Sequence, residues 1–79
     1  MNIRIRYFAA FREATGIASE DIETRVETAA ALFAERTDRY PGLQSWSASQ
    51  VAVNDELADW GRVLTDGDEV LFFPPVAGG

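Results

Sequence analysis

Residues 1–7, MNIRIRY, alternate between apolar and polar side chains, and Phe8 follows on the side of the polar ones. This period of two predicts a strand that buries only one of its faces. Ile3, Ile5 and Tyr7 share the face expected to be buried, and Arg4, Arg6 and Phe8 share the other. Residues 9–14 then favour a short helix, and Gly16 can end that helix with a positive φ.

Residues 21–26 alternate again, with Ile22, Thr24 and Val26 on one face. Because only a short helix separates this segment from the first strand, we expect the two strands to pair antiparallel. Further short strands are predicted over residues 50–53 and 69–73, and Leu57 and Trp60 are expected in a brief strand or an extended segment. Turns at residues 54–55 and 66–68 separate them.

The middle of the chain predicts one substantial helix. Thr28 is a suitable N-cap, and three alanines with high helix propensity follow it. Glu35 and Asp38 are expected to point away from the apolar stripe of this helix. The stripe itself comprises Ala29, Leu32, Phe33, Arg36 and Tyr40. Pro41-Gly42 ends the helix, and residues 42–50 are predicted to form a loop that holds Trp46.

The order of these elements predicts an α+β fold in a chain of 79 residues, long enough for one small core. We expect a mixed four- to five-stranded sheet with one main helix packed on one face, a roll of the ubiquitin type. The folded domain is expected over residues 1–73, followed by an extended tail over residues 74–79.

Composition limits the chemistry that the side chains can perform. The chain has no cysteine and no histidine, and all seven of its positive charges are arginine. Thiolate chemistry, cysteine-bearing zinc sites, histidine bases and side-chain Schiff bases are therefore excluded. We expect no metal site and no bound cofactor. The net charge of −6 argues against nucleic acid or a membrane as partner, and the lack of a signal-peptide pattern predicts a cytoplasmic protein.

The last six residues, Pro74-Pro75-Val76-Ala77-Gly78-Gly79, form an unusual segment. Two prolines favour an extended backbone that cannot join a sheet ladder, and two glycines leave the tip without side chains. Six extended residues reach at most about 20 Å. A slender tip that ends in a carboxylate can enter a slot in another protein. Since no neighbouring residue can act on this carboxylate, we expect partners to supply the chemistry.

Two segments carry a resemblance to a known family. Residues 64–79, LTDGDEVLFFPPVAGG, resemble the C-terminus of the MoaD family, the small sulfur-carrying subunits of molybdopterin synthase. Residues 8–16, FAAFREATG, resemble the F-A-x-x-R-E-x-x-G block of that family. The resemblance covers essentially the whole chain, although residues 28–62 match only in pattern. It implies a β-grasp fold.

The resemblance also implies a mechanism in molybdenum cofactor biosynthesis. An E1-like (MoeB-like) activating enzyme would use ATP to adenylate Gly79, which would then become a thiocarboxylate. The tail from Pro74 to Gly78 would insert into the large (MoaE-like) subunit, where Gly79 would donate sulfur to cyclic pyranopterin monophosphate. The chain would not be an enzyme on its own, because the large subunit supplies the catalytic pocket. The resemblance also implies a heterotetramer with that subunit.

Three residues of the folded part are candidates for the partner interface. Phe72 and Phe73 must point to opposite faces of the last strand, so one of them packs under the helix. The resemblance favours Phe73 and Phe8 as docking residues, with simple packing as the alternative. Arg12 either pairs with a nearby acid on the surface or fixes the tail or a partner carboxylate.

Other functions fit the same sequence. A sulfur carrier of the thiamine pathway (ThiS-like) shares the fold and the diglycine, but such carriers lack a Phe-Phe-Pro-Pro run. A ubiquitin-like modifier would be joined through Gly79 to lysines of other proteins. A plain β-grasp interaction domain would carry an inert tail.

Overall fold

The computed structural model describes residues 1–45 and 49–73. Within these residues five strands form one sheet, and two α-helices and a 3-10 turn accompany it. The strands are β1 (Asn2–Tyr7), β2 (Ser19–Glu23), β3 (Gln50–Val53), β4 (Glu56–Ala58) and β5 (Glu69–Phe73). The helices are α1 (Ala10–Thr15) and α2 (Ala29–Arg39), and the 3-10 turn is η1 (Pro41–Ser45). Neither helix of this described part is long and apolar enough to cross a membrane.

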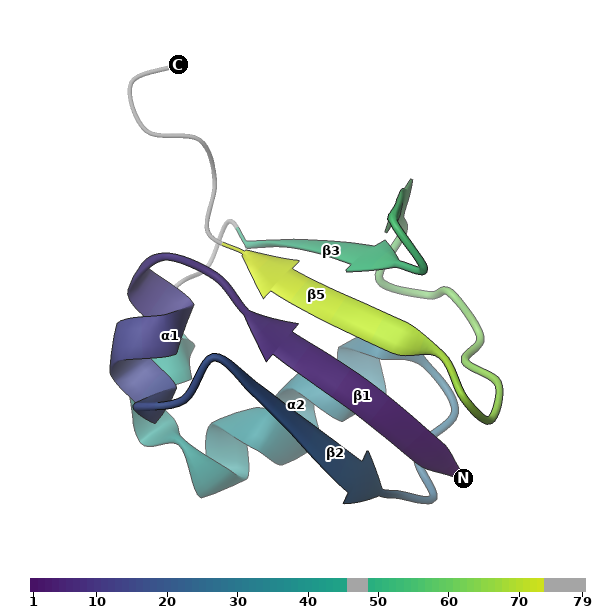
Figure 1. Cartoon of the computed structure of the whole chain (residues 1–79), viewed down its shortest axis with the longest axis horizontal. Coiled ribbons are helices and arrows are strands. Elements are labelled where there is room, and N and C mark those ends of the chain that lie inside the picture. Colours follow the sequence, from purple (N-terminus) through teal and green to yellow (C-terminus); the bar gives the residue numbers. More distant parts are fainter. Residues whose placement is uncertain (46–48, 74–79) are drawn as a thin grey trace.

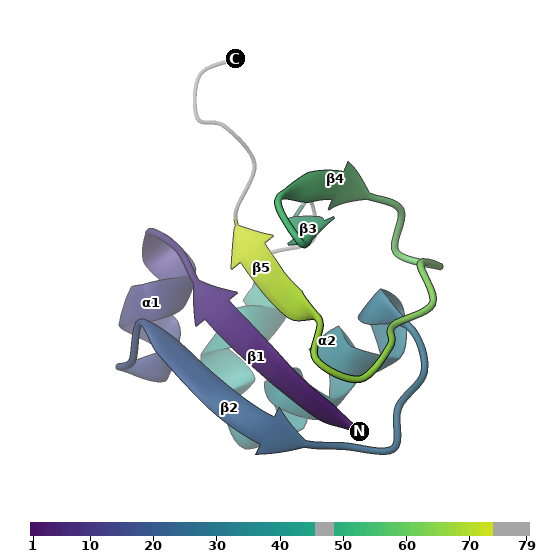
Figure 2. The ribbon, with the colours of Figure 1, turned by 45° about the vertical axis from the view of Figure 1, so that its right-hand side comes forward.

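The sheet has the order β2-β1-β5-β3-β4. β1 and β5 are parallel, and the other neighbouring pairs are antiparallel. The last strand of the chain therefore lies in the middle of the sheet, between β1 and β3 (Figure 1). α2 crosses behind the sheet, whereas no described helix covers the opposite, open face (Figures 1 and 2). The predicted mixed sheet with one covering helix is confirmed.

The core lies between the sheet and α2. The inward side chains of β1 are buried, and Phe72 of β5 is fully buried beside them. The ring of Phe33 from α2 meets the ring of Phe72 edge-on at 5.0 Å between centroids, and Trp60 stacks on Phe72 at 5.9 Å. Trp60 thus covers an edge of the core, as predicted. Trp46, for which the same role was predicted, lies outside the described residues.

Several predicted boundaries are confirmed. Thr28 caps α2, since its side-chain oxygen accepts a hydrogen bond from the Ala31 N–H at 3.2 Å. Gly16 follows α1 with a φ of 80°. β3 and β5 have the predicted bounds. β1 and β2 pair antiparallel, as expected from the short connection between them.

Two predicted details were wrong. β2 begins at Ser19 rather than at residue 21 and ends at Glu23, because it pairs with β1 as far as Arg6. The segment after α2, predicted to be a loop, begins as the 3-10 turn η1. Leu57 lies in β4 and Trp60 follows it, which agrees with the brief strand or extended segment predicted around these two residues.

Glu35 was also misplaced, because it does not point away from the packed side of α2. Its Oε2 accepts a hydrogen bond from the Thr24 hydroxyl at 2.9 Å, and its Oε1 lies 3.1 Å from an Arg36 nitrogen. Arg36 also reaches Glu20 at 3.5 Å, and Glu20 accepts a hydrogen bond of 2.7 Å from the Tyr7 hydroxyl. Burial, together with this bond to Glu20, raises the pKa of Tyr7. This polar cluster joins α2 to β1 and β2.

Candidate functional site

The end of β5 is held from both sides. Phe73 pairs with Gln50 of β3, and Phe72 pairs with Tyr7 of β1. One residue further along, the Phe8 N–H donates to the Phe72 carbonyl oxygen at 3.3 Å. The point from which the last six residues of the sequence continue is therefore fixed to the centre of the sheet.

The predicted tail lies outside the described residues. This applies to Pro74, Pro75, Val76, Ala77 and Gly78, which were predicted to insert into a partner. It also applies to Gly79, the predicted site of the chemistry. Their roles stay predictions, and the described part of the candidate site is the surface around the end of β5.

The two phenylalanines of β5 point to opposite faces, as the alternation predicted. Phe72 is fully buried under α2, on the same side as Val70. Phe73 and Leu71 are half-buried and lie on the open face. Phe73 is therefore the phenylalanine that a partner can reach.

Strand register places five apolar residues together on the open face. Leu71 pairs with Ala52 of β3, and Ala52 pairs with Leu57 of β4, so these three side chains lie in one row. Phe73 lies one step further along β5, and Phe8 follows the paired residue Tyr7 on the neighbouring strand. We call this set, Phe8, Ala52, Leu57, Leu71 and Phe73, the apolar surface; Ala52, at its centre, is only 8% exposed.

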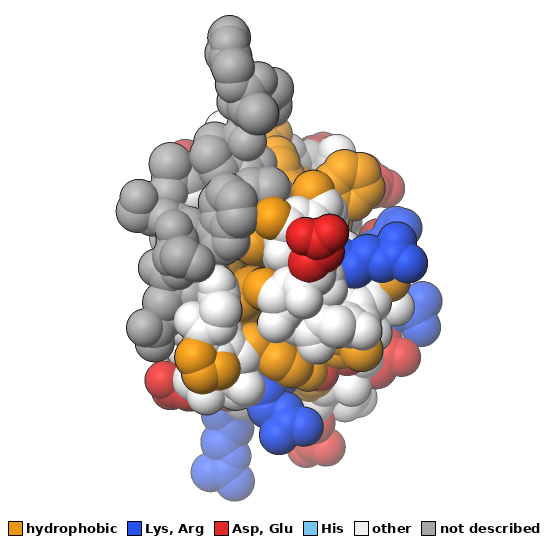
Figure 3. Space-filling model, turned by 90° about the vertical axis from the view of Figure 1, so that its left-hand side faces the viewer, with side chains coloured by type: hydrophobic (Ala, Val, Ile, Leu, Met, Phe, Trp, Pro, Cys, Tyr) orange, Lys and Arg blue, Asp and Glu red, His pale blue; other side chains and the backbone are white. Residues whose placement is uncertain are grey.

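Two members of the apolar surface are strongly exposed, Phe8 at 62% and Leu57 at 72%. Large side chains with this exposure, gathered in one patch, mark interaction sites more often than isolated ones do. Figure 3 views the molecule from the α1 side, where hydrophobic side chains come to the surface beside acidic and arginine side chains. Phe8 is thus accessible, and its docking role stays a prediction; Leu57 is a member of the apolar surface that the sequence interpretation missed.

Arg12 lies on α1 and is exposed. No hydrogen bond or ion pair joins its guanidinium to another residue of the described part, so the predicted surface pair with Glu13 or another acid is not formed there. Arg12 and Glu13 line a shallow hollow with Ala9, Ala10 and Gly16. Within the described part, the Arg12 guanidinium is therefore available to bind the tail or a carboxylate of a partner.

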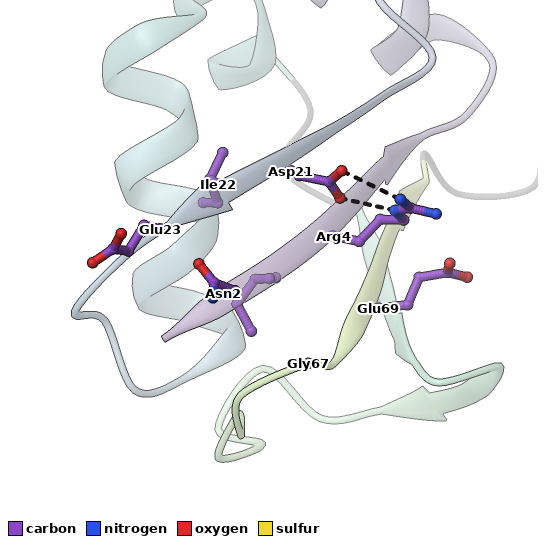
Figure 4. A pocket seen from close by; sticks show the side chains of 8 residues that line it. Asn2, Arg4, Asp21, Ile22, Glu23, Gly67 and Glu69 are labelled. Carbon is purple, nitrogen blue, oxygen red and sulfur yellow. Dashed lines mark hydrogen bonds and ion pairs between the residues drawn. The ribbon is translucent and has the colours of Figure 1, made fainter.

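The opposite end of the open face is charged. The Arg4 Nε lies 2.8 Å from the Asp21 Oδ1, and an Arg6 nitrogen lies 3.6 Å from a Glu69 oxygen. Arg4, Asp21 and Glu69 border an open hollow of about 480 Å³, in which Arg4 and Asp21 point toward each other (Figure 4). The hydrogen bond from Arg4 lowers the pKa of Asp21. Such exposed pairs add little stability, and with side chains 58% and 70% exposed the Arg4–Asp21 pair is part of the solvated surface.

The turn that leads into β5 is rigid. The Asp68 carboxylate accepts hydrogen bonds from the Thr65 N–H at 2.8 Å, the Thr65 hydroxyl at 3.1 Å and the Asn54 amide at 2.8 Å. Burial raises the pKa of Asp68, but these hydrogen bonds outweigh it and the pKa lies below its ordinary value. Gly67 supplies the positive φ, 88°, that the turn requires. This structural role is the one predicted for residues 66–68.

Comparison with known proteins connects this geometry to a family. The model of the ThiS family matches residues 5–79. The chain belongs to the ThiS family. Within this family it is 38% identical to the molybdopterin synthase sulfur carrier subunit of Escherichia coli, over 98% of this chain and 99% of that protein. The resemblance to the small subunits of molybdopterin synthase is thereby confirmed.

Solved structures confirm the β-grasp fold of this ThiS-family chain. SAMP1, the small archaeal modifier protein of Haloferax volcanii, has a TM-score of 0.84 and 25% identity, with full coverage of both chains. A chain from the complex of subunits 1 and 2 of the molybdopterin-converting factor of Helicobacter pylori has a TM-score of 0.68 and 27% identity, also with full coverage of both.

Proposed function

We propose that this ThiS-family chain is the sulfur carrier subunit of a molybdopterin synthase. The observation that carries the proposal is its identity of 38% to a molybdopterin synthase sulfur carrier subunit over nearly the full length of both chains. The alternative of a thiamine-pathway carrier shares the family model. It is disfavoured because relatives from bacteria, fungi and humans that match nearly the whole chain bear the molybdopterin synthase name.

The reacting group in this proposal is the carboxylate of Gly79. It attacks the α-phosphate of ATP on an E1-like (MoeB-like) enzyme, pyrophosphate leaves, and an acyl-adenylate forms. A sulfur donor then displaces AMP to give the thiocarboxylate, whose sulfur attacks the cyclic pyranopterin monophosphate. In that attack a C–S bond forms at a carbon of the pterin and an oxygen substituent of this carbon leaves. Water then hydrolyses the resulting thioester at the Gly79 carbonyl, so the sulfur stays on the pterin and the carboxylate is restored. Adenylation is required because a carboxylate is a poor electrophile, and a terminal sulfur anion is a better nucleophile than the oxygen it replaces.

The large subunit is the proposed docking partner, and it would supply the catalytic pocket. The solved complex of subunits 1 and 2 of the Helicobacter pylori factor supports such a pairing. On this chain the apolar surface flanks the end of β5, so docking there would bring residues 74–79 to the partner. Phe8 and Phe73 would be buried on docking, and Arg12 would meet a carboxylate of the tail or the partner. The assembly is proposed to be a heterotetramer located in the cytoplasm.

The test is the mass of the intact chain. Coexpression with the activating enzyme and a sulfur source should replace one oxygen of the chain by sulfur. A variant that lacks Gly79 is the matched control and should keep its mass. An unchanged mass of the unaltered chain under these conditions would contradict the proposal.

A second candidate function is protein modification through Gly79. It is favoured by the likeness to SAMP1 of Haloferax volcanii, which spans all of both chains. Because this chain has no lysine, it could be attached to other proteins but could not form lysine-linked polymers of itself. Conjugates of higher mass that disappear on deletion of Gly78-Gly79 would support this function.

A further inference from the structure

The chain turns from β1 into α1 through an alanine in a conformation that alanine rarely adopts. Ala9 has φ 51° and ψ −123°. These are the values of the first central residue of a type II′ turn, a position that favours glycine because a Cβ is crowded there. The Phe11 N–H donates to the Phe8 carbonyl oxygen at 3.0 Å and closes the turn. The other described non-glycine residues with positive φ are Asn54 and Asp55, whose types tolerate it better.

This turn fixes the backbone of Phe8 on both sides. The Phe8 N–H donates to the Phe72 carbonyl oxygen, and its own carbonyl accepts the bond that closes the turn. The carbonyl of Ala9 accepts from the Arg12 N–H at 3.0 Å and from the Glu13 N–H at 3.3 Å. The turn is therefore tied to β5 at one end and to α1 at the other, while the Phe8 side chain stays 62% exposed.

A glycine in place of Ala9 would remove the steric cost but would also admit many more backbone conformations. Once the surrounding hydrogen bonds have imposed the turn, alanine allows its backbone fewer alternative conformations than glycine would. A strained backbone conformation persists only where the surrounding contacts hold it in place, and such residues are found most often at functional sites. Here the strained residue directly follows the most exposed aromatic side chain of the apolar surface.

We propose that Ala9 is a positioning residue for docking. It holds Phe8 beside Phe73 in the direction that the large subunit recognises, so less ordering is needed when the complex forms. The inference rests on the proposed function, because the partner it names is the large subunit of molybdopterin synthase. It assigns Ala9 a role in partner affinity that acts through Phe8.

The test compares the unaltered chain with Ala9→Gly, using thermal unfolding and binding to the large subunit encoded in the same genome. Relief of the strain should raise the melting temperature of the variant. Its affinity should nevertheless fall by about three- to tenfold, the range that corresponds to ordering one side chain, with faster dissociation. A purely structural role would change the melting temperature alone, so the opposite signs of the two effects identify positioning.

Two control variants sharpen this test. In a Phe8→Ala background, Ala9→Gly should have no further effect on affinity, because the proposed role acts through Phe8. Ala34→Gly on the exposed side of α2 introduces glycine without strain, so it should lower the melting temperature and leave binding unchanged.

Three results would overturn the inference while the proposed function stands. These are equal affinity of Ala9→Gly and the unaltered chain, a loss of affinity that persists without Phe8, and a lowered melting temperature of Ala9→Gly. Failure of the unaltered chain itself to bind the large subunit would refute the proposed function, and this inference with it.

Discussion

Replacement of Phe8 by alanine tests the apolar surface directly. The side chain is 62% exposed in the free chain, and docking would bury that part. Taking about 200 Å² for a phenylalanine side chain, some 125 Å² would leave water, which corresponds to about 3 kcal/mol at roughly 25 cal/mol per Å². Alanine keeps its Cβ, and the partner pocket relaxes in part. We therefore expect a loss of about 2 kcal/mol, or roughly thirtyfold in Kd for the large subunit.

The assay is calorimetric titration of the large subunit with each variant, after urea unfolding has shown that the variant is folded. Val63→Ala is the matched control, because Val63 is 63% exposed but belongs to the segment before β5, at the other end of the sheet (Figure 1). Its Kd should stay within about twofold of that of the unaltered chain, since a distant surface residue contributes little. Equal losses for both variants would refute the assignment of the docking face, as would an unchanged Kd for Phe8→Ala.

Further predictions concern the core, the turn before β5 and the tail. Phe72→Ala should lower the free energy of unfolding by about 3 to 5 kcal/mol, because it leaves a cavity in a fully buried site; urea unfolding measures this. Asp68→Ala should cost about 2 kcal/mol at pH 7, since three hydrogen bonds to a carboxylate are lost. Because the pKa of Asp68 is lowered in the folded chain, the carboxylate stabilises the fold fully above the ordinary aspartate pKa. This stabilisation is lost as the pH falls through the folded-state pKa. The unaltered chain and Asp68→Ala should therefore approach the same free energy of unfolding in acid. An extra tryptophan after Gly79 should abolish sulfur loading, read from the intact mass.

Local patterns were sufficient to predict much of the fold. The strict alternation of β1, the Thr28 cap and the bounds of β3 and β5 follow from neighbouring residues alone. The start of β2 does not, because it depends on how far β1 continues to pair. The position of Glu35 likewise depends on Thr24, which lies outside α2 and approaches it only in the folded chain.

Members of the apolar surface that stand in a sequence motif could be predicted. Members that strand pairing brings to this surface could not. Phe8 and Phe73 stand in segments that resemble a family, and alternation alone separates Phe73 from Phe72. Leu57 joins the apolar surface only through the register with Ala52. The strain at Ala9 has no local signal, since alanine usually indicates a helix rather than a positive φ.

The central place of β5 has a mechanical consequence. A pull transmitted through Phe73 along the strand loads the ladders to β1 and β3 in shear, because their hydrogen bonds lie across the direction of force. Under such a load the force is distributed over the hydrogen bonds of both ladders, and several of them must break at once before β5 can move. We therefore expect β5 to resist a pull on its end better than an edge strand, which has hydrogen bonds on one side only.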